Sequence, residues 1–496
     1  MGHISSAGGE SIYRYPPINL LDKSVDTCRC DVAEEIRLCS HRILAILTAF
    51  DITAKLSEII HGPRVTRYEV ILNSGVKLSK LVNLSQDIAL ALGVPDVQIA
   101  PVLGKYSTVC IEVPNRFVAS VRIRDVIESR EFIKHPSFVA VAIGKDGEGN
   151  NVVGDIDRLS PVFVAGTTGS GKSALINSFI TSILFKATPD EVRFIMIDTK
   201  GVELTPYEGI PQLLIPVVTD PYKAVAVLQW SVYEIMKRYK VFSENAVNNL
   251  TDYNVMAEKT TGMLKLPLML IIIDDLSDIM AVSAMDTEDL ICRVAQAGKQ
   301  AGIYLIISTQ ISSPRVITNR MKLAIRSCAA FAVSSVSESY LILGSAGAEK
   351  LVGKGDMLFF SLDDVKPTRV QGCFITPKEI DKVVEFIKDE TEKAHCNQDV
   401  IEKTQQVNNV KAGKATTTTV PAGIENDGDL FSSAMELVLE TGQASVSMLQ
   451  RRLKLGYSRA SRLVDEMEEL GFVGPFEGSI PRQILITREE WQALYK

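Results

Sequence analysis

The chain has 496 residues, of which 46% are hydrophobic and 23% are charged, and its formal net charge is −7. This length allows about three domains with buried cores, and the acidic balance excludes nucleic-acid binding through overall charge, so any contact with DNA must come from local basic patches. The eight cysteines include no Cys-x-x-Cys pair, and no apolar run approaches about 18 residues, so we expect reduced thiols and no segment that anchors in a membrane.

The first part of the chain predicts a small α+β domain. Residues 1–30 are irregular, and residues 31–130 alternate between helical and strand-like patterns. The expected helices cover residues 31–50 and 78–92, and the expected strands cover residues 52–60, 65–72, 97–100 and 108–113. This unit contains no cluster of residues typical of catalysis, so we interpret it as a structural or assembly domain.

Residues 131–394 have the pattern of a larger α/β domain. A hairpin over residues 138–143 and 152–155 precedes an alternation of apolar strands and helices. The expected strands cover residues 161–165, 193–198, 268–274, 303–309 and 329–333, and the expected helices cover residues 174–185, 222–243, 288–301 and 377–388. Apolar strands joined by helical crossovers predict a parallel sheet that is covered on both faces. Ligands of such sheets bind at the carboxyl ends of the strands.

The last hundred residues divide into two parts. Residues 395–428 are poor in apolar side chains and predict a flexible linker, because such a segment cannot bury enough surface to order itself. Residues 429–496 then predict a winged helix-turn-helix. Its expected helices cover residues 430–440, 446–453 and 458–470, and its expected wing covers residues 472–473 and 483–487.

The strongest motif has the spacing of a phosphate-binding P-loop, Gly-x-x-x-x-Gly-Lys-Ser, and lies between an apolar strand and a helix. Its glycines allow backbone N–H groups to turn toward a phosphate, and the helix adds its positive N-terminal end. We expect Lys172 to contact the β- and γ-phosphates and the Ser173 hydroxyl to bind Mg²⁺. The predicted nucleotide-binding residues are Gly166, Thr167, Thr168, Gly169, Ser170, Gly171, Lys172 and Ser173.

Two further strand ends complete the predicted catalytic site. The apolar strand over residues 268–274 ends in Asp274 and Asp275. We expect Asp274 to hold Mg²⁺ through water and Asp275 to orient or deprotonate the attacking water, although a carboxylate pair at a strand end is also typical of a helix cap. Gln310 follows another strand at the same edge and is predicted to sense the γ-phosphate or to position the water.

Several longer motifs make the resemblance to a family specific. Residues 197–211, 296–302 and 347–357 resemble the motor domain of the FtsK/SpoIIIE DNA translocases. Residues 62–69 resemble the domain that precedes this motor, and residues 440–475 resemble, with gaps, its C-terminal winged helix. The resemblance extends from about residue 50 to the end of the chain.

The resemblance implies a RecA-like P-loop NTPase motor, an N-terminal α+β (alpha) domain and a C-terminal winged-helix (gamma) domain. It implies ATP and Mg²⁺ as cofactors, and a hexameric ring of identical subunits that pumps double-stranded DNA during bacterial chromosome segregation, in cell division or sporulation. A site-specific recombinase is a further candidate partner. Full-length members are tethered by N-terminal membrane helices at the division septum. The printed sequence has none, so we expect a cytoplasmic chain that is either a soluble member or a trimmed form.

Basic residues are placed for contact with DNA in two regions. The winged helix carries Arg451, Arg452, Lys454, Arg459 and Arg462 without an intervening acid. Such a cluster suits entry into the major groove, although a solvated helix face has the same pattern. The predicted DNA-binding residues are Lys350 and Lys354 on a glycine-rich motor loop, with Arg451, Arg452, Ser458, Arg459, Arg462 and Arg482 in the winged helix.

Three departures from the family affect the predicted rate and specificity. The second carboxylate of the strand-end pair is Asp275 where the family usually has Glu. Arginines of the family align with Cys328, Val336 and Tyr340, so we consider Arg326 as a substitute that would reach a neighbouring subunit's phosphate. Ser458 stands where Asn is common.

The predicted function is a DNA-dependent ATPase that translocates double-stranded DNA, with slow or retuned hydrolysis. Two alternatives stay open: a related secretion or conjugation ATPase, and a DNA-binding scaffold with weak catalysis.

Overall fold

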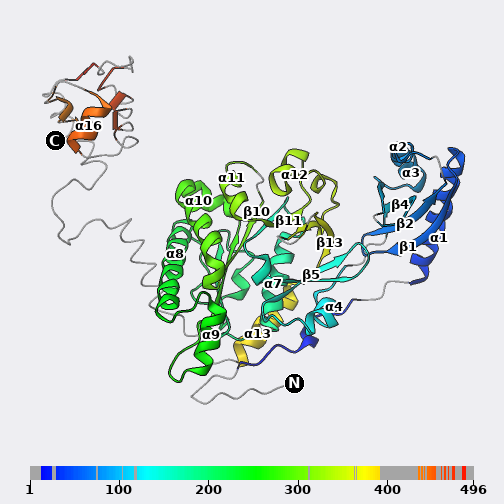
Figure 1. The fold of residues 1–496 in the computed structure, drawn as a ribbon, viewed down its shortest axis with the longest axis horizontal. Coiled ribbons are helices and arrows are strands. Elements are labelled where there is room, and N and C mark those ends of the chain that lie inside the picture. The colour runs from blue at the N-terminus through cyan, green and yellow to red at the C-terminus, as the bar shows by residue number, and fades with distance from the viewer. Residues whose placement is uncertain are drawn as a thin grey trace. The chain divides into compact units, whose positions relative to one another are not determined.

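The structure of the chain, a computed structural model, describes residues 13–24, 29–73, 76–102, 104–116, 120–310, 313–361, 364 and 366–390, together with single residues and short runs between 434 and 486 (Figure 1). The chain separates into two compact units, Met1–Lys414 and Ala415–Lys496, which are described individually. Among the described residues, no helix combines the length and the hydropathy that a membrane crossing requires.

The N-terminal domain is a four-stranded antiparallel sheet with helices on one face. The strand order is β1-β2-β4-β3, and the elements are α1 (Arg29–Ala49), β1 (Ala54–His61), β2 (Val65–Leu72), α2 (Leu78–Asn83), α3 (Ser85–Leu92), β3 (Gln98–Pro101) and β4 (Thr108–Pro114). Alternate residues Tyr68, Val70 and Leu72 join the core, as a strand with one buried face requires. The single helix predicted over residues 78–92 is wrong: Leu84 leaves the helical conformation, with ψ of 1°, as its side chain packs inward.

The segment before this domain packs on the following one. The short 3-10 helix η1 (Ile18–Leu20) leads into Leu21, which is buried in the core of the larger domain. The Tyr13 hydroxyl donates a hydrogen bond of 2.9 Å to the Leu184 carbonyl. Residues 13–24 therefore belong structurally to the larger domain, although the sequence pattern there is irregular.

The larger domain is built on a nine-stranded sheet with the order β6-β5-β13-β12-β11-β7-β10-β9-β8. Its strands are β5 (Ala140–Asp146), β6 (Asn151–Asp155), β7 (Val162–Ala165), β8 (Val192–Asp198), β9 (Leu268–Asp274), β10 (Ile303–Thr309), β11 (Ser327–Phe331), β12 (Asp356–Phe360) and β13 (Thr368–Gly372). Five of them, from β11 to β8, are parallel, and the other four pair antiparallel. The predicted parallel arrangement is confirmed, because the five parallel strands are those expected from their apolar pattern, and the predicted hairpin corresponds to the antiparallel pair β5 and β6. The strands β12 and β13 were not predicted, and their short connection allows only antiparallel pairing.

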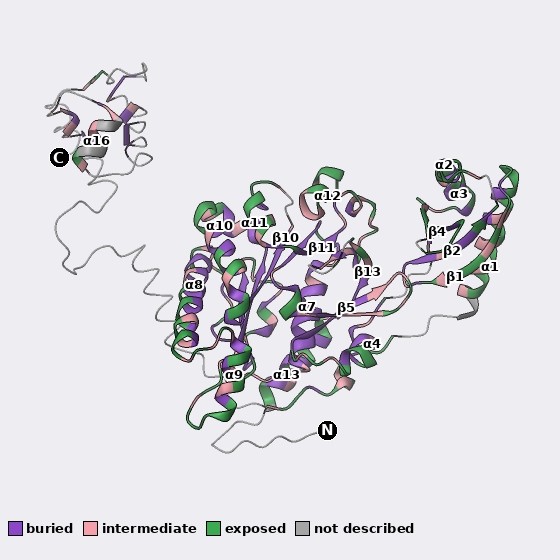
Figure 2. Ribbon diagram, viewed as in Figure 1, coloured by how far each residue is buried: buried purple, intermediate pink, exposed green. Residues whose placement is uncertain are grey.

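Helices cover both faces of this sheet. Leu268, Leu270 and Ile272 of β9 join one core cluster with α7 (Lys172–Leu184) and α13 (Pro377–Glu390), whereas Met269, Ile271 and Ile273 join the other with α8 (Pro221–Glu244), α10 (Leu276–Ala301) and α11 (Asn319–Ala324). The interior strands are accordingly buried along their length (Figure 2). Each such side chain contributes about 1.5–3 kcal/mol by burial, so the strands that carry the site are rigid.

The remaining described helices of this unit are short or peripheral. They are α4 (Ile123–Ile127), α5 (Arg130–Ile133), α6 (Ile156–Leu159), α9 (Leu250–Lys259), α12 (Val336–Leu343), η2 (Thr205–Tyr207) and η3 (Ala348–Lys350). The helix α10 begins at Leu276, twelve residues before the predicted start at residue 288, and the part that was missed contains an irregular residue, Ser283, which interrupts the helical conformation.

The C-terminal unit is described only in part. It contains α16 (Val446–Leu453) and an antiparallel bridge between Val473 and Ile484. Met435, Leu449 and Met467 are among the residues of its small core. The predicted linker over residues 395–428 lies outside the described residues.

Candidate nucleotide site

The P-loop lies between β7 and α7, at the carboxyl end of the central strand β7. Gly166, Gly169 and Gly171 have positive φ values of 152°, 73° and 122°, which explains why glycine occupies them. A Cβ atom on Gly166 would lie 2.7 Å from the Cβ of Phe331, and one on Gly171 would lie 2.7 Å from the backbone nitrogen of Gly355. The loop is therefore closely enclosed by β11 and by the segment that precedes β12.

Lys172 is buried at the first turn of α7 and folds back on the loop. Its Nζ donates hydrogen bonds of 2.8 Å to the carbonyl oxygens of Gly166 and Thr167. Burial lowers the pKa of Lys172 to about 8, although Asp274 and Asp275 act in the opposite direction. A phosphate bound in the loop would place a negative charge beside this ammonium and so stabilise its charged form.

The neighbouring strands bring the other predicted groups to the same edge. Strand β10 lies between β7 and β9, and the Thr168 hydroxyl donates a hydrogen bond of 3.0 Å to Oε1 of Gln310. Asp274 ends β9, where burial first, and then the charges of Asp198 and Glu203, raise its pKa to about 6. A divalent cation would offset this excess of negative charge.

Asp275 is the N-cap of α10, with a left-handed φ of 64°. Its Oδ1 accepts hydrogen bonds from the backbone nitrogen and hydroxyl of Ser277, and its Oδ2 accepts one of 2.5 Å from Lys200 Nζ. Burial alone would raise the pKa of Asp275, but Lys200 and Ser277 lower it overall. The helix-cap interpretation of the strand-end pair is therefore confirmed for Asp275, and the same carboxylate lies at the sheet edge that carries the P-loop.

Two residues at this edge were missed by sequence reasoning. Asp198, at the end of β8, pairs with Asp274 in the strand register and is fully buried. Its carboxylate accepts four backbone N–H groups of the following loop, those of Lys200, Gly201, Glu203 and Leu204, at 2.9–3.1 Å. Asp198 therefore shapes the loop that delivers Lys200 to Asp275. The second missed residue is Lys200. Both Asp198 and Lys200 lie in the motif over residues 197–211, so this motif could have indicated them.

The predicted DNA-contacting lysines of the motor loop lie in different surroundings. Lys350 ends η3 and is exposed. Lys354 is also exposed, but the next residue, Gly355, donates a backbone hydrogen bond of 2.7 Å to the Ser170 carbonyl of the P-loop. The segment around Lys354 therefore forms part of the wall of the nucleotide site.

The structure also locates the candidates for an arginine that acts on a neighbouring subunit. Arg326 precedes β11, which runs parallel to β7 with Ser327 opposite Val162. Arg326 is exposed and lies at the amino end of β11, whereas the P-loop follows the carboxyl end of the parallel strand β7. Cys328 is buried, which raises the pKa of its thiol to about 12, whereas Val336 and Tyr340 are exposed on α12.

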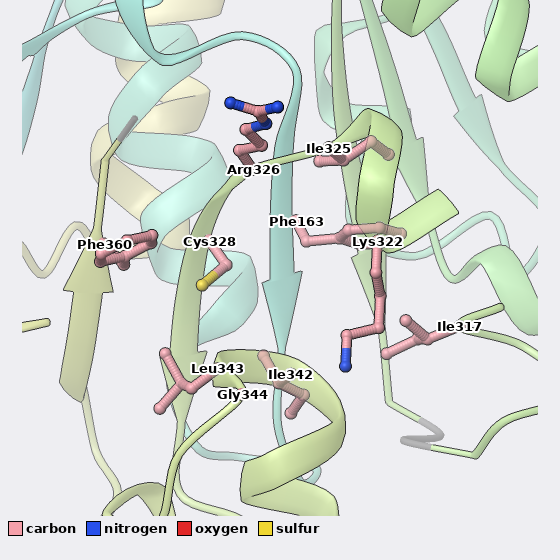
Figure 3. A pocket seen from close by; sticks show the side chains of 10 residues that line it. All are labelled: Phe163, Ile317, Lys322, Ile325, Arg326, Cys328, Ile342, Leu343, Gly344 and Phe360. Carbon is pink, nitrogen blue, oxygen red and sulfur yellow. The ribbon is translucent and has the colours of Figure 1, made fainter. Parts of the chain in front are cut away.

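Arg326 borders a pocket of about 370 Å³ on one face of the sheet. The pocket has an apolar floor that includes Phe163, Cys328 and Phe360. Arg326 lies at one end, and the side chain of Lys322 extends toward the other (Figure 3), where its Nζ donates a hydrogen bond of 3.3 Å to the Tyr340 carbonyl.

Most predicted DNA-binding residues of the winged helix lie outside the described part of the chain. These are Ser458, Arg459, Arg462 and Arg482, and the side chain of Arg451. Arg452 is described and is exposed on α16.

Comparison with known families confirms the resemblance of the sequence motifs. Residues 122–314 match the FtsK/SpoIIIE family, residues 15–115 match the FtsK alpha domain, and residues 425–487 match the Ftsk gamma domain. Together with the sheet and the P-loop, these matches confirm the predicted fold class of an α/β P-loop motor with an α+β domain before it and a winged-helix domain after it.

Curated relatives are similar along nearly the whole chain. The DNA translocase FtsK of Clostridium acetobutylicum is 43% identical over 493 residues, which are 99% of this chain and 63% of the relative. The DNA translocase SpoIIIE of Bacillus subtilis is 41% identical over 97% of this chain and 60% of the relative. Among solved structures, the conjugation coupling protein TcpA of pCW3 with ATPgS is 21% identical, with a TM-score of 0.49 over 71% of this chain and 98% of that chain, a similarity too weak to support a conclusion.

Proposed function

We propose that this chain, which belongs to the FtsK/SpoIIIE family, is an ATP-driven motor that translocates double-stranded DNA. One observation carries the proposal: Lys172, Asp274 and Gln310 lie at one edge of the sheet, around a P-loop whose glycines have positive φ values. The chain spans about 63% of the length of the first relatives, so the proposal concerns the activity of these residues.

The site would bind ATP with Mg²⁺. The backbone N–H groups from Thr167 to Ser173 would surround the β-phosphate, and Lys172 would exchange its two carbonyl partners for phosphate oxygens. Ser173 and Asp274 would hold Mg²⁺, and the raised pKa of Asp274 fits this role because a cation would stabilise its charged form. The metal supplies stabilisation of the charge that develops on the phosphoryl group.

Asp275 would orient or deprotonate the attacking water. In the observed arrangement, Lys200 and Ser277 donate hydrogen bonds to its two oxygens and lower its pKa, so the carboxylate is a weakened base. Lys200 is partly exposed, with 42% of its side chain accessible, whereas that of Asp275 is 3% accessible. We therefore propose that Lys200 turns away, toward the γ-phosphate, before hydrolysis, and that Gln310 helps to position the water.

The DNA would be bound by two regions of the chain. The match of residues 425–487 to the gamma domain supports a winged helix that reads orienting sequences, with Arg452, Arg459 and Arg462 as the first candidates for contact with bases. Lys350 is exposed on the motor and is a candidate for phosphate contact. Membership of the family supports a ring of identical subunits, in which Arg326 would contact a neighbouring copy, and a recombinase partner stays a prediction.

Steady-state ATP hydrolysis with and without long duplex DNA tests the proposal. Because translocation couples hydrolysis to movement, we expect duplex DNA to increase turnover, and we expect the protein to displace a third strand from a triplex on the same duplex only when ATP is present. Arg326→Ala should lower the stimulated rate, and mixing it with Lys172→Ala subunits should restore part of the rate if the arginine acts between copies, because an intact P-loop then meets the intact arginine of a neighbouring copy. Hydrolysis that responds to single strands or to protein, but not to duplex DNA, would instead favour a secretion or conjugation ATPase.

A further inference from the structure

A three-residue segment separates the P-loop from the N-terminal domain. The segment is Gly353–Gly355, and its last residue donates a backbone hydrogen bond of 2.7 Å to the Ser170 carbonyl. A Cβ atom on Gly171 would lie 2.7 Å from the nitrogen and 2.8 Å from the Cα of Gly355. The P-loop and the segment are thus in backbone-to-backbone contact, so a shift of one moves the other.

The backbone conformation of this segment needs support. Gly353, Lys354 and Gly355 all have positive φ values, of 78°, 51° and 92°. This conformation is unfavourable for Lys354, an L-residue with a side chain. Three consecutive left-handed residues persist only where the surroundings hold them.

The support comes from the N-terminal domain. Arg64, next to the start of β2, donates through Nη2 to the carbonyls of Gly353 and Lys354, and through Nε to Oε1 of Gln371 at 2.7 Å. Gln371, on β13, donates in turn to the Lys354 carbonyl at 3.0 Å. The guanidinium group of Arg64 therefore binds the segment and, at the same time, Gln371, the second residue that supports the segment.

The burial of Arg64 argues against a purely stabilising role. The residue is 8% exposed, and burial lowers the pKa of its guanidinium. Burying a charge opposes folding unless its partners compensate. By contrast Arg67, three residues later, forms ion pairs with Glu148 and Glu112 at the partly exposed surface.

We infer that Arg64 is a positioning residue for nucleotide binding, which holds Gly353–Gly355 in its left-handed conformation and, through Gly355, keeps the P-loop in the shape that accepts phosphate. The inference rests on the proposed function of the P-loop as an ATP site. By linkage, nucleotide binding also strengthens the contact between the N-terminal domain and the motor. The four-stranded sheet, which has no catalytic residues of its own, thereby contributes to ATP affinity.

The test compares Arg64→Ala, Arg64→Lys and Arg67→Ala in the full chain. We expect Arg64→Ala to raise the Kd of a fluorescent ATP analogue and the KM for ATP by roughly five- to twenty-fold, in the range typical of couplings between sites, while kcat changes by less than about two-fold. Arg64→Lys should recover part of the affinity, because one donor remains. Arg67→Ala is the matched control: it removes contacts between the same strand and the motor, but not with the segment, and should leave Kd unchanged.

A second variant keeps the test decisive if Arg64→Ala does not fold. Gln371→Leu removes the other support of the Lys354 carbonyl and should raise Kd in the same direction, with less than additive effects when the two changes are combined. An unchanged Kd in a folded Arg64→Ala protein, or an equal loss of affinity in Arg67→Ala, would overturn the inference. If the unaltered chain binds the analogue no better than Lys172→Ala does, the proposed function fails instead.

Discussion

The four-stranded sheet and the nine-stranded sheet differ in whether the ends of their strands can form a catalytic site. In the antiparallel sheet of β1 to β4, neighbouring strands end at opposite edges, and one face is covered by helices. In the parallel half of the larger sheet, β7, β8, β9 and β10 end at one edge, where α7 and α10 also begin. Lys172, Asp198, Asp274 and Gln310 meet there for that reason.

The direction of the strands, more than their composition, therefore decides where a site forms. Both sheets contain buried charged residues, such as Glu69 in β2 and Asp274 in β9. Glu69 pairs with Lys105 on the same domain, whereas Asp274 faces an edge with an excess of negative charge. Among the described residues, Arg64, next to the start of β2, connects the antiparallel domain to the segment beside the P-loop.

The largest expected effect separates the two sheets directly. Replacing Lys172 with Ala removes the only ammonium that reaches the P-loop carbonyls in the described structure, and we expect ATP hydrolysis to fall by about 10²–10³-fold, since single electrostatic contacts of this kind supply factors of this size. Replacing Lys105, which binds Glu58 and Glu69 on the antiparallel sheet, should leave turnover within about two-fold. Steady-state turnover measures both variants, and comparable losses would contradict the division between the sheets.

The next effect concerns Asp275. Asn caps a helix as well as Asp does, so Asp275→Asn should preserve α10 but remove the carboxylate that handles the water. We expect kcat to fall by about 10²–10⁴-fold, the range for a general base, with the KM for ATP nearly unchanged. Thermal unfolding checks that the cap is retained. Normal turnover in this variant would show that Asp275 is a structural cap alone.

A third prediction follows from the two shifted pKa values. Above pH about 8 the free protein loses the proton of Lys172, and below pH about 6 Asp274 gains one. ATP binding with Mg²⁺ needs the charged form of both groups, so affinity should fall on either side of this window, by up to about ten-fold per pH unit. Titration of nucleotide affinity against pH checks this, and Lys172→Arg is the control, because its guanidinium stays charged and the alkaline decrease should vanish.

The smallest effect concerns Lys200, whose release from Asp275 we propose. Lys200→Met removes the ion pair and allows the pKa of Asp275 to rise, which makes the carboxylate a stronger base. We expect hydrolysis without DNA to rise a few-fold and the stimulation by DNA to shrink, measured as the ratio of the two rates. A fall in both rates would mean that Lys200 is needed on the phosphate more than it restrains Asp275.

Local patterns were sufficient for much of this fold. The strands β2, β9 and β10 were predicted with their observed bounds, because long apolar or alternating runs between turn residues leave few alternatives. The strands β12 and β13 were missed, since β12 is an apolar run of only five residues and β13, also of five residues, is mostly polar, so both carry little signal. The break at Leu84 was missed because its side chain continues the helical pattern while its backbone does not.

The nucleotide site divides in the same way. The sequence was sufficient to predict the motif from Gly166 to Ser173 and the strand-end carboxylates, because their chemistry depends on residues that are neighbours in the chain. The ion pair between Asp275 and Lys200, which lies 75 residues away, could not be predicted in this way. The same holds for the backbone contact between Gly355 and Ser170.

The domain types, the family and the phosphate-binding loop could be predicted from the residues alone, since each of these depends on periodicity or on short spacing. The order of the nine strands, the pairing of Lys200 with Asp275 and the contact of Arg64 with the wall of the P-loop required the folded chain. Contacts between distant segments depend on which elements pack together, and hydrophobic packing is not directional. A pattern of apolar residues specifies that a strand is buried, but not which strand lies beside it.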